Sequence, residues 1–219
     1  MKENLTELVF ILDKSGSMSG LEKDTIGGFN SFIKKQKEEA GEAILSTIVF
    51  SDRCDVLHDR VNIKEVKELT DKDYFASGCT ALLDAIGYSI KHIMKVHNEL
   101  NDEDKPSKTL FVIKTDGYEN SSKEFSYPTI KKLIEERRES GWEFIFLGAN
   151  IDSVKEAETL GIDKDFAVNY NCDTEGVDIN YKALSKAVAS MRETGKIKSS
   201  WRESIDKDYE SRDKNRKWN

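Results

Sequence analysis

Short apolar runs alternate along this chain with segments in which apolar side chains recur at helical spacing. Five apolar runs are predicted as strands: residues 8–12, 43–50, 109–115, 144–147 and 166–168. Five further segments carry apolar side chains every three or four residues and are predicted as helices: residues 21–36, 82–94, 130–134, 154–160 and 181–191. Strands that alternate with helices predict an α/β fold with a mainly parallel sheet and helices on both faces.

A sixth strand is predicted at residues 54–61, directly after the short turn Ser51-Asp52-Arg53. A connection this short requires antiparallel pairing with the strand before it. Because residues 54–61 are more polar than the other strands, we expect them at an edge of the sheet. Two local features add detail. Ile63, Val66 and Leu69 suggest a short helix, and Gly27-Gly28 suggests that the first helix approaches the sheet closely.

The length of 219 residues fits one α/β domain with an appendage. We assign residues 1–195 to the domain. Residues 196–219 are dense in charge, carry Trp201 and show little periodicity, so they form a charged C-terminal extension. This extension is either an appended helix or a loose tail.

Charge and cysteine content narrow the class of partner. The formal net charge of −7 disfavours nucleic acid and anionic membranes as partners. Three cysteines without a CxxC pair do not suggest a disulfide framework. Residues 1–7 contain no apolar signal core, and no stretch is apolar enough to span a bilayer. We therefore expect a cytoplasmic protein.

Oxygen-bearing side chains stand where strands are predicted to end. With the six strands numbered in chain order, Asp13, Ser15 and Ser17 follow the first strand (residues 8–12) and Asp116 follows the fourth (residues 109–115). Thr80 opens the helix at residues 82–94. Ligands bind at the carboxyl ends of parallel strands, where the strand order reverses. With the order 3-2-1-4-5-6, Asp13 and Asp116 would share one crevice with the three hydroxyls. Two carboxylates and hydroxyls suit Mg²⁺, Mn²⁺ or Ca²⁺.

This pattern resembles the metal-ion-dependent adhesion site (MIDAS) of von Willebrand factor A (vWA) domains: D-x-S-x-S from Asp13 to Ser17, then Thr80, then Asp116. The resemblance covers roughly residues 5–195 and extends to stand-alone bacterial or phage members. It implies a Rossmann-like, three-layer vWA fold. It also implies that the serines and the threonine bind the cation directly, and that the aspartates bind directly or through water. The cation would keep one position for an Asp or Glu carboxylate of a partner protein.

Three functional hypotheses remain on the sequence. The first is a non-enzymatic, metal-dependent protein-interaction module. The second is a Mg²⁺-dependent phosphotransfer enzyme with Asp13 as nucleophile, although the D-x-D pair of aspartate-nucleophile phosphatases is replaced here by Asp13-Lys14-Ser15. The third is a scaffold that the cation only stabilises.

Each site residue also has a purely structural reading. Ser17 or Ser19 could cap the first helix, Thr80 could cap the second, and Asp116-Gly117 could be a turn. Their joint placement favours the metal site. Six further residues are expected on its rim: Lys14, Met18, Tyr74, Tyr118, Glu119 and Asn120.

Overall fold

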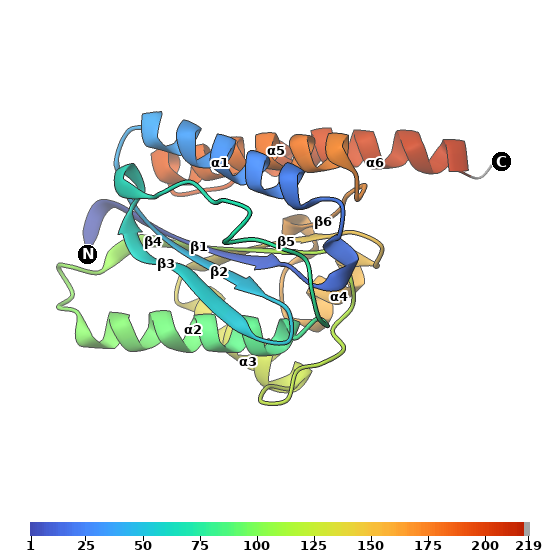
Figure 1. Ribbon diagram of the computed structural model, residues 1–219. Coiled ribbons are helices and arrows are strands. Elements are labelled where there is room, and N and C mark those ends of the chain that lie inside the picture. Colours follow the sequence, from blue (N-terminus) through green and yellow to red (C-terminus); the bar gives the residue numbers. More distant parts are fainter. Residues whose placement is uncertain (217–219) are drawn as a thin grey trace.

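A six-stranded sheet runs through the middle of the molecule in the order β3-β2-β1-β4-β5-β6 (Figure 1). The computed structural model describes residues 1–216. The strands are β1 (Lys2–Asp13), β2 (Glu42–Phe50), β3 (Cys54–Asn62), β4 (Pro106–Thr115), β5 (Trp142–Gly148) and β6 (Ala167–Asn169). All neighbouring strands pair in parallel except β3, which runs antiparallel to β2 at the edge. The predicted strand order and edge strand are confirmed.

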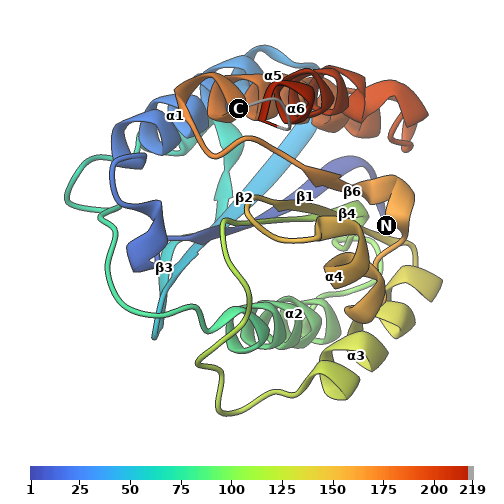
Figure 2. The ribbon, with the colours of Figure 1, turned by 90° about the vertical axis from the view of Figure 1, so that its right-hand side faces the viewer.

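Helices cover both faces of this sheet (Figure 2). One face carries α1 (Glu22–Glu38), α5 (Thr174–Thr194) and α6 (Glu203–Arg216), and the other carries α2 (Leu82–Glu99), α3 (Tyr127–Glu139) and α4 (Ser153–Thr159). Because side chains alternate along a strand, β1 contributes side chains to the hydrophobic core on each face of the sheet. Leu8, Phe10 and Leu12 pack toward α1 and α5, whereas Val9 and Ile11 pack toward α2. Within the described residues, no helix has the length and apolarity needed to cross a membrane.

Gly28 allows two helices, rather than a helix and the sheet, to approach closely. A Cβ atom at Gly28 would lie 2.2 Å from the ring of Tyr181, which belongs to α5. A side chain there would push α5 away from α1. The first helix does pack on the sheet, through Phe29 and Phe32, but Gly28 makes room for Tyr181 of α5 and not for the sheet.

The segment after β3 is only briefly helical. A 3-10 turn spans Ile63–Glu65, and the predicted longer helix through Leu69 is wrong. Val66 has an extended backbone, and the side chain of Asn30 on α1 binds the backbone of Leu69 at both groups. Its amide nitrogen donates to the carbonyl (2.9 Å), and its oxygen accepts from the N–H (2.8 Å). This clamp replaces the hydrogen bonds that a helix would supply, while Ile63, Val66 and Leu69 remain buried.

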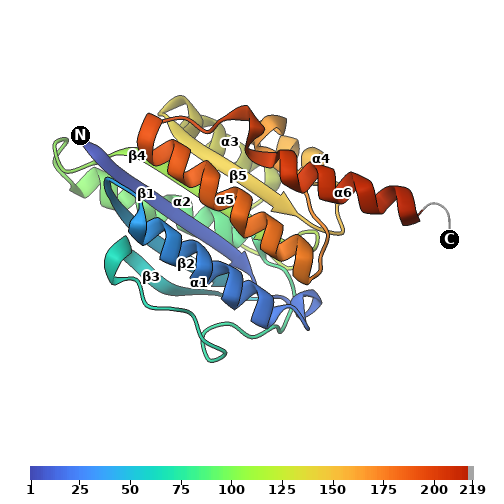
Figure 3. The ribbon, with the colours of Figure 1, turned by 90° about the horizontal axis from the view of Figure 1, so that it is seen from above.

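The C-terminal extension is a docked helix. Its 3-10 turn Ser199–Arg202 places Trp201 in the core, where the indole N–H donates to the carbonyl of Asp165 (3.0 Å). Ile205 follows on the same buried side, and α6 lies beside α5 on one face of the sheet (Figure 3). The last three residues of the predicted extension, 217–219, lie outside the described residues.

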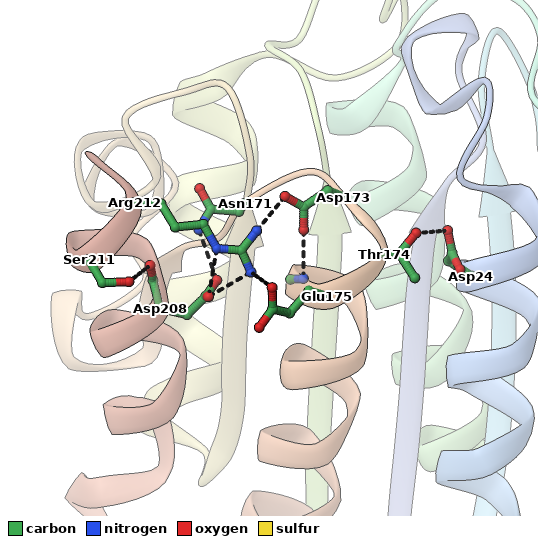
Figure 4. A network of polar contacts seen from close by, with 9 residues as sticks. Asp24, Asn171, Asp173, Thr174, Glu175, Asp208, Ser211 and Arg212 are labelled. Atoms are coloured by element: carbon green, nitrogen blue, oxygen red, sulfur yellow. Dashed lines mark hydrogen bonds and ion pairs between the residues drawn. The ribbon is translucent and has the colours of Figure 1, made fainter. Parts of the chain in front are cut away.

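An ion-pair network ties α6 to the loop between β6 and α5 (Figure 4). The guanidinium of Arg212 contacts the carboxylates of Asp173, Glu175 (2.9 Å) and Asp208 (2.6 Å). Asp208 also accepts a hydrogen bond from the amide of Asn171 (2.8 Å). These contacts anchor the loop of residues 170–173, which passes next to the carboxyl end of β4.

Candidate metal centre

The loop that follows β1 folds its polar side chains into one tight turn. The backbone N–H of Ser15 donates to Oδ1 of Asp13 (2.7 Å), which fixes the carboxylate at the end of the strand. A 3-10 turn over Gly16–Met18 then brings Oγ of Ser17 to 3.1 Å from Oγ of Ser15. The turn is held from the other side by Gly16, whose N–H donates to the carbonyl of Gly78 (3.0 Å).

The end of β4 completes this turn, because β4 is the parallel neighbour of β1. Oγ of Ser17 donates to Oδ1 of Asp116 (2.6 Å), across 99 residues of sequence. The hydroxyl of Thr115 donates to Oδ2 of Asp13 (2.6 Å). The structure thus brings Asp13, Ser15, Ser17 and Asp116 together, as their places at strand ends predicted.

Thr80 belongs to a third segment, which is held to the loop after β4 through Asn120. Its N–H donates to the side-chain oxygen of Asn120 (2.9 Å), and its carbonyl accepts from the N–H of Asn120 (3.0 Å). A methyl group at Gly117 would lie 3.9 Å from both Oγ of Ser17 and Oγ1 of Thr80. The hydroxyls of Ser17 and Thr80 therefore both border the position of Gly117, directly after Asp116.

The helix-capping readings of these residues are wrong. The residue that precedes α2 is Ala81, with no side-chain cap, and the first turn is satisfied instead by Glu119, which accepts from the N–H of Leu83 (2.9 Å). The residue that precedes α1 is Leu21, also without a side-chain cap. The hydroxyls of Ser17 and Thr80 are consequently not used to begin helices.

The donor set fits a hard divalent cation. Ligands at 2.0–2.1 Å in octahedral geometry lie about 3 Å from one another. The separations of 3.1 Å between Ser15 and Ser17 and 2.6 Å between Ser17 and Asp116 match that spacing. Among the side chains that the structure describes, residues 1–212, no group of three or more His, Cys, Asp or Glu is arranged for a metal. A cation here would therefore depend on hydroxyls as well as on the two carboxylates.

The two carboxylates are both buried, with 2% exposure each. Burial raises the pKa of Asp13, the hydrogen bonds from Thr115 and Ser15 oppose that rise, and the nearby charge of Asp116 adds to it. Because the groups that donate hydrogen bonds to Asp13 are neutral, they do not compensate the charge of its carboxylate. A bound cation would compensate it.

Lys114, which sequence reasoning missed, lies fully buried beneath the site. Its side chain is 2% exposed, and its ammonium lies 4.9 Å from the ring centre of Tyr170. Burial lowers the pKa of Lys114 to about 8, while the charges of Cys172, Asp116 and Asp13 oppose that shift. The sequence could have pointed to Lys114, because it is a lysine near the end of an otherwise apolar strand that is predicted to be buried on both faces.

The expected rim is correct only in part. Tyr118 is exposed, and so is Phe75, which sequence reasoning missed and over which the ammonium of Lys14 lies at 4.9 Å. Met18 and Tyr74 are buried, and the Tyr74 hydroxyl donates to the carbonyl of Asp13. Glu119 and Asn120 bind the backbone at the start of α2. Cys172, also missed, lies with Sγ 3.9 Å from Oδ2 of Asp116.

Comparison with known proteins identifies the architecture. Residues 7–182 match the family model described as the von Willebrand factor type A domain. No protein of curated function matches the sequence.

Several solved structures share the fold at low sequence identity. Proximal thread matrix protein 1 from the mussel byssus aligns with a TM-score of 0.58 and 13% identity over 86% of this chain and 48% of its own. Another structure of that protein is described as having a zinc-occupied MIDAS motif (TM-score 0.56, 14% identity, 86% of this chain and 47% of that one).

The pilus adhesin SpaC from Lactobacillus rhamnosus GG aligns with a TM-score of 0.62 and 11% identity over 87% of this chain and 30% of its own. The present chain therefore spans less than half the length of each of these three aligned chains.

Proposed function

This chain belongs to the von Willebrand factor type A domain family, and on that premise we propose that it is a metal-dependent protein-interaction module. The cation, Mg²⁺ or a similar hard divalent ion, would be held by Ser15, Ser17 and Thr80, with Asp13 and Asp116 binding directly or through water. Its function would be to attract an Asp or Glu carboxylate on a partner protein.

The observation that carries this proposal is the convergence of hydroxyls on Asp116. Oγ of Ser17 lies 3.1 Å from Oγ of Ser15 and 2.6 Å from Oδ1 of Asp116, separations that ligands of one small cation can adopt. Ser17 is exposed, whereas Asp13 and Asp116 are buried behind it. A cation at this point would be reached from the solvent side past Ser17, where a partner's carboxylate could complete its coordination.

The surroundings of the site also suit a protein partner. Phe75 is 52% exposed and Tyr118 is 53% exposed, and each belongs to a loop that contacts the site. The backbone N–H of Ser77, two residues after Phe75, donates to the carbonyl of Lys14 (2.8 Å), and Tyr118 follows Asp116 by two residues. Exposed aromatic side chains are common where proteins bind one another.

The contacts of Asp13 favour binding over phosphotransfer. Both of its carboxylate oxygens accept hydrogen bonds, from Ser15 N–H and from the Thr115 hydroxyl, and the side chain is 2% exposed. A nucleophile that attacks phosphorus must be reached by a phosphoryl group, which is much larger than a single cation. Asp13 instead has the position of a buried carboxylate that compensates a cation.

Selection of peptides on the immobilised protein would test this function. A random peptide library selected in Mg²⁺ should yield sequences that contain Asp or Glu and that dissociate when EDTA removes the metal. Asp116→Ala should abolish their binding. Asp102→Ala provides the matched control, since Asp102 is an aspartate with 92% of its side chain exposed. Selected peptides that bind equally well in EDTA, or equally well to Asp116→Ala, would contradict the proposal.

A further inference from the structure

Lys114 is a buried cation without an evident structural partner. Its ammonium has no hydrogen-bond acceptor among the described residues. Its neighbours include the rings of Tyr170, at 4.9 Å, and Tyr181, at 6.0 Å. Burial of an ammonium group costs several kcal/mol unless other charges compensate it. Nearby negative charges are therefore required to offset the cost of burying this ammonium.

The compensating charges lie at the candidate metal centre. Lys114 is the last residue but one of β4, and Asp116 follows directly after the end of that strand, two residues further on. Asp13 stands at the end of the adjacent strand β1. The aromatic residues around Lys114 also contact the backbone at this end of the sheet, since the hydroxyl of Tyr170 donates to the carbonyl of Thr115 (3.5 Å).

The buried charges at the carboxyl end of the sheet do not cancel one another. The three most deeply buried charged side chains at this end are Asp13, Asp116 and Lys114, each 2% exposed. With both aspartates ionised, these three groups carry one net negative charge. A divalent cation turns that into one net positive charge, and a single partner carboxylate would then neutralise it. Without the ammonium, the loaded site would be neutral before any partner arrived.

We propose that Lys114 is a built-in counter-cation that weakens metal binding and strengthens the attraction of the loaded site for an acidic ligand. This inference rests on the proposed function, and it adds the residue that sets the balance between the two binding steps. Neutralising Lys114 should therefore change the two affinities in opposite directions. A merely structural lysine would change both in the same direction or neither.

The test measures both affinities on one variant, Lys114→Met, which keeps the unbranched shape and removes the charge. Titration of the metal-free protein with Mn²⁺ should give a Kd about tenfold lower than in the wild type. The Mn²⁺-loaded protein is then titrated with acetate, and binding is measured through the relaxation of water protons near the bound Mn²⁺. The Kd for acetate should be about tenfold higher than in the wild type. Lys114→Gln should behave like Lys114→Met, with a lower Kd for Mn²⁺ and a higher Kd for acetate. It provides the test if Lys114→Met does not fold.

Lys108→Met is the matched control. Lys108 lies on the same strand, about 20 Å from Lys114 at 3.3 Å per residue, and its ammonium donates to the carbonyl of Arg192 (2.7 Å). It should leave both constants unchanged. Unchanged constants in the Lys114 variants, or constants that move in the same direction, would overturn the inference while leaving the proposed function intact. Failure of the wild type to bind Mn²⁺ would instead remove the proposed function, and the inference with it.

Discussion

Two buried acids on the same strand have opposite surroundings. Glu7 and Asp13 lie on β1, and their side chains are shielded from solvent. Both oxygens of Glu7 contact basic groups of the protein: Arg60 on β3 and His97 on α2. Asp13 receives hydrogen bonds only from neutral donors, Ser15 and Thr115.

This contrast distinguishes an acid that is paired within the fold from one that, on the proposed function, would bind a cation. At the amino end of the sheet the fold supplies its own cation, the guanidinium of Arg60, so the charge of Glu7 is compensated in the isolated chain. At the carboxyl end the ammonium of Lys114 is nearby, but it makes no hydrogen bond to either aspartate in the described structure. The remaining negative charge there is available to a cation from solution.

The largest expected effect is on stability at the amino end. Glu7→Gln leaves Arg60 and His97 without their carboxylate, and loss of one member of a largely buried ion pair costs about 3 kcal/mol or more. Urea unfolding should show that loss in the free energy of unfolding. The exposed Glu3 lies on the same strand, and Glu3→Gln should change that free energy by less than about 0.5 kcal/mol. Equal effects of the two substitutions would remove the distinction between Glu7 and an ordinary surface acid.

A slightly smaller effect is expected from the cation itself. A ligand that binds only the folded state adds about 2.7 kcal/mol to the free energy of unfolding at one hundred times its Kd. Urea unfolding with and without Mg²⁺ should show this gain in the wild type and, from a lower starting point, in Glu7→Gln. Asp116→Ala should show none. A gain in Asp116→Ala would place the stabilising cation elsewhere.

Removal of charge at the carboxyl end should cost little in the metal-free protein. Asp13→Asn keeps an oxygen that accepts hydrogen bonds and removes a desolvated charge that has no bonded cation. The free energy of unfolding should therefore change by about 1 kcal/mol or less, well below the loss for Glu7→Gln. A loss as large as that of Glu7→Gln would show that Asp13 is also paired internally.

The smallest effect concerns pH. Because burial raises the pKa of Asp13 above the ordinary aspartate value of 3.8, the folded protein holds this proton more tightly than the unfolded chain does. Its contribution to the stability of the metal-free protein is therefore full below pH 3.8 and is lost as pH rises through the folded pKa. Asp13→Asn should flatten that part of the curve of unfolding free energy against pH. An unchanged slope in the variant would assign it to another group.

The sequence was sufficient for the features that depend on periodicity and on strand ends. The apolar runs and the short polar turn at Ser51 predicted the sheet and its antiparallel edge. The reversal of strand order then brought Asp13 and Asp116 to one place. These inferences need no knowledge of which distant side chains touch.

The features that the sequence did not reveal depend on such distant partners. The glycine at position 28 is explained by the nearby ring of Tyr181. The non-helical backbone at Leu69 is explained by its two hydrogen bonds to the amide of Asn30. Glu119 has the pattern of a rim residue, but it satisfies the first turn of α2. Lys114 is visible as an unusual charge, yet only the packed structure shows that its ammonium lies among tyrosines below the site.

Calorimetric titration with Mn²⁺ of three metal-free proteins tests the central claim most directly. The wild type and Glu7→Gln should each bind one Mn²⁺ with similar affinity, because the amino-end acid takes no part in the site. Asp13→Asn should bind at least about a hundredfold more weakly, since the site loses one of its two carboxylates. Equal binding by Asp13→Asn, or absence of binding by the wild type, would contradict a cation site at the carboxyl end of the sheet.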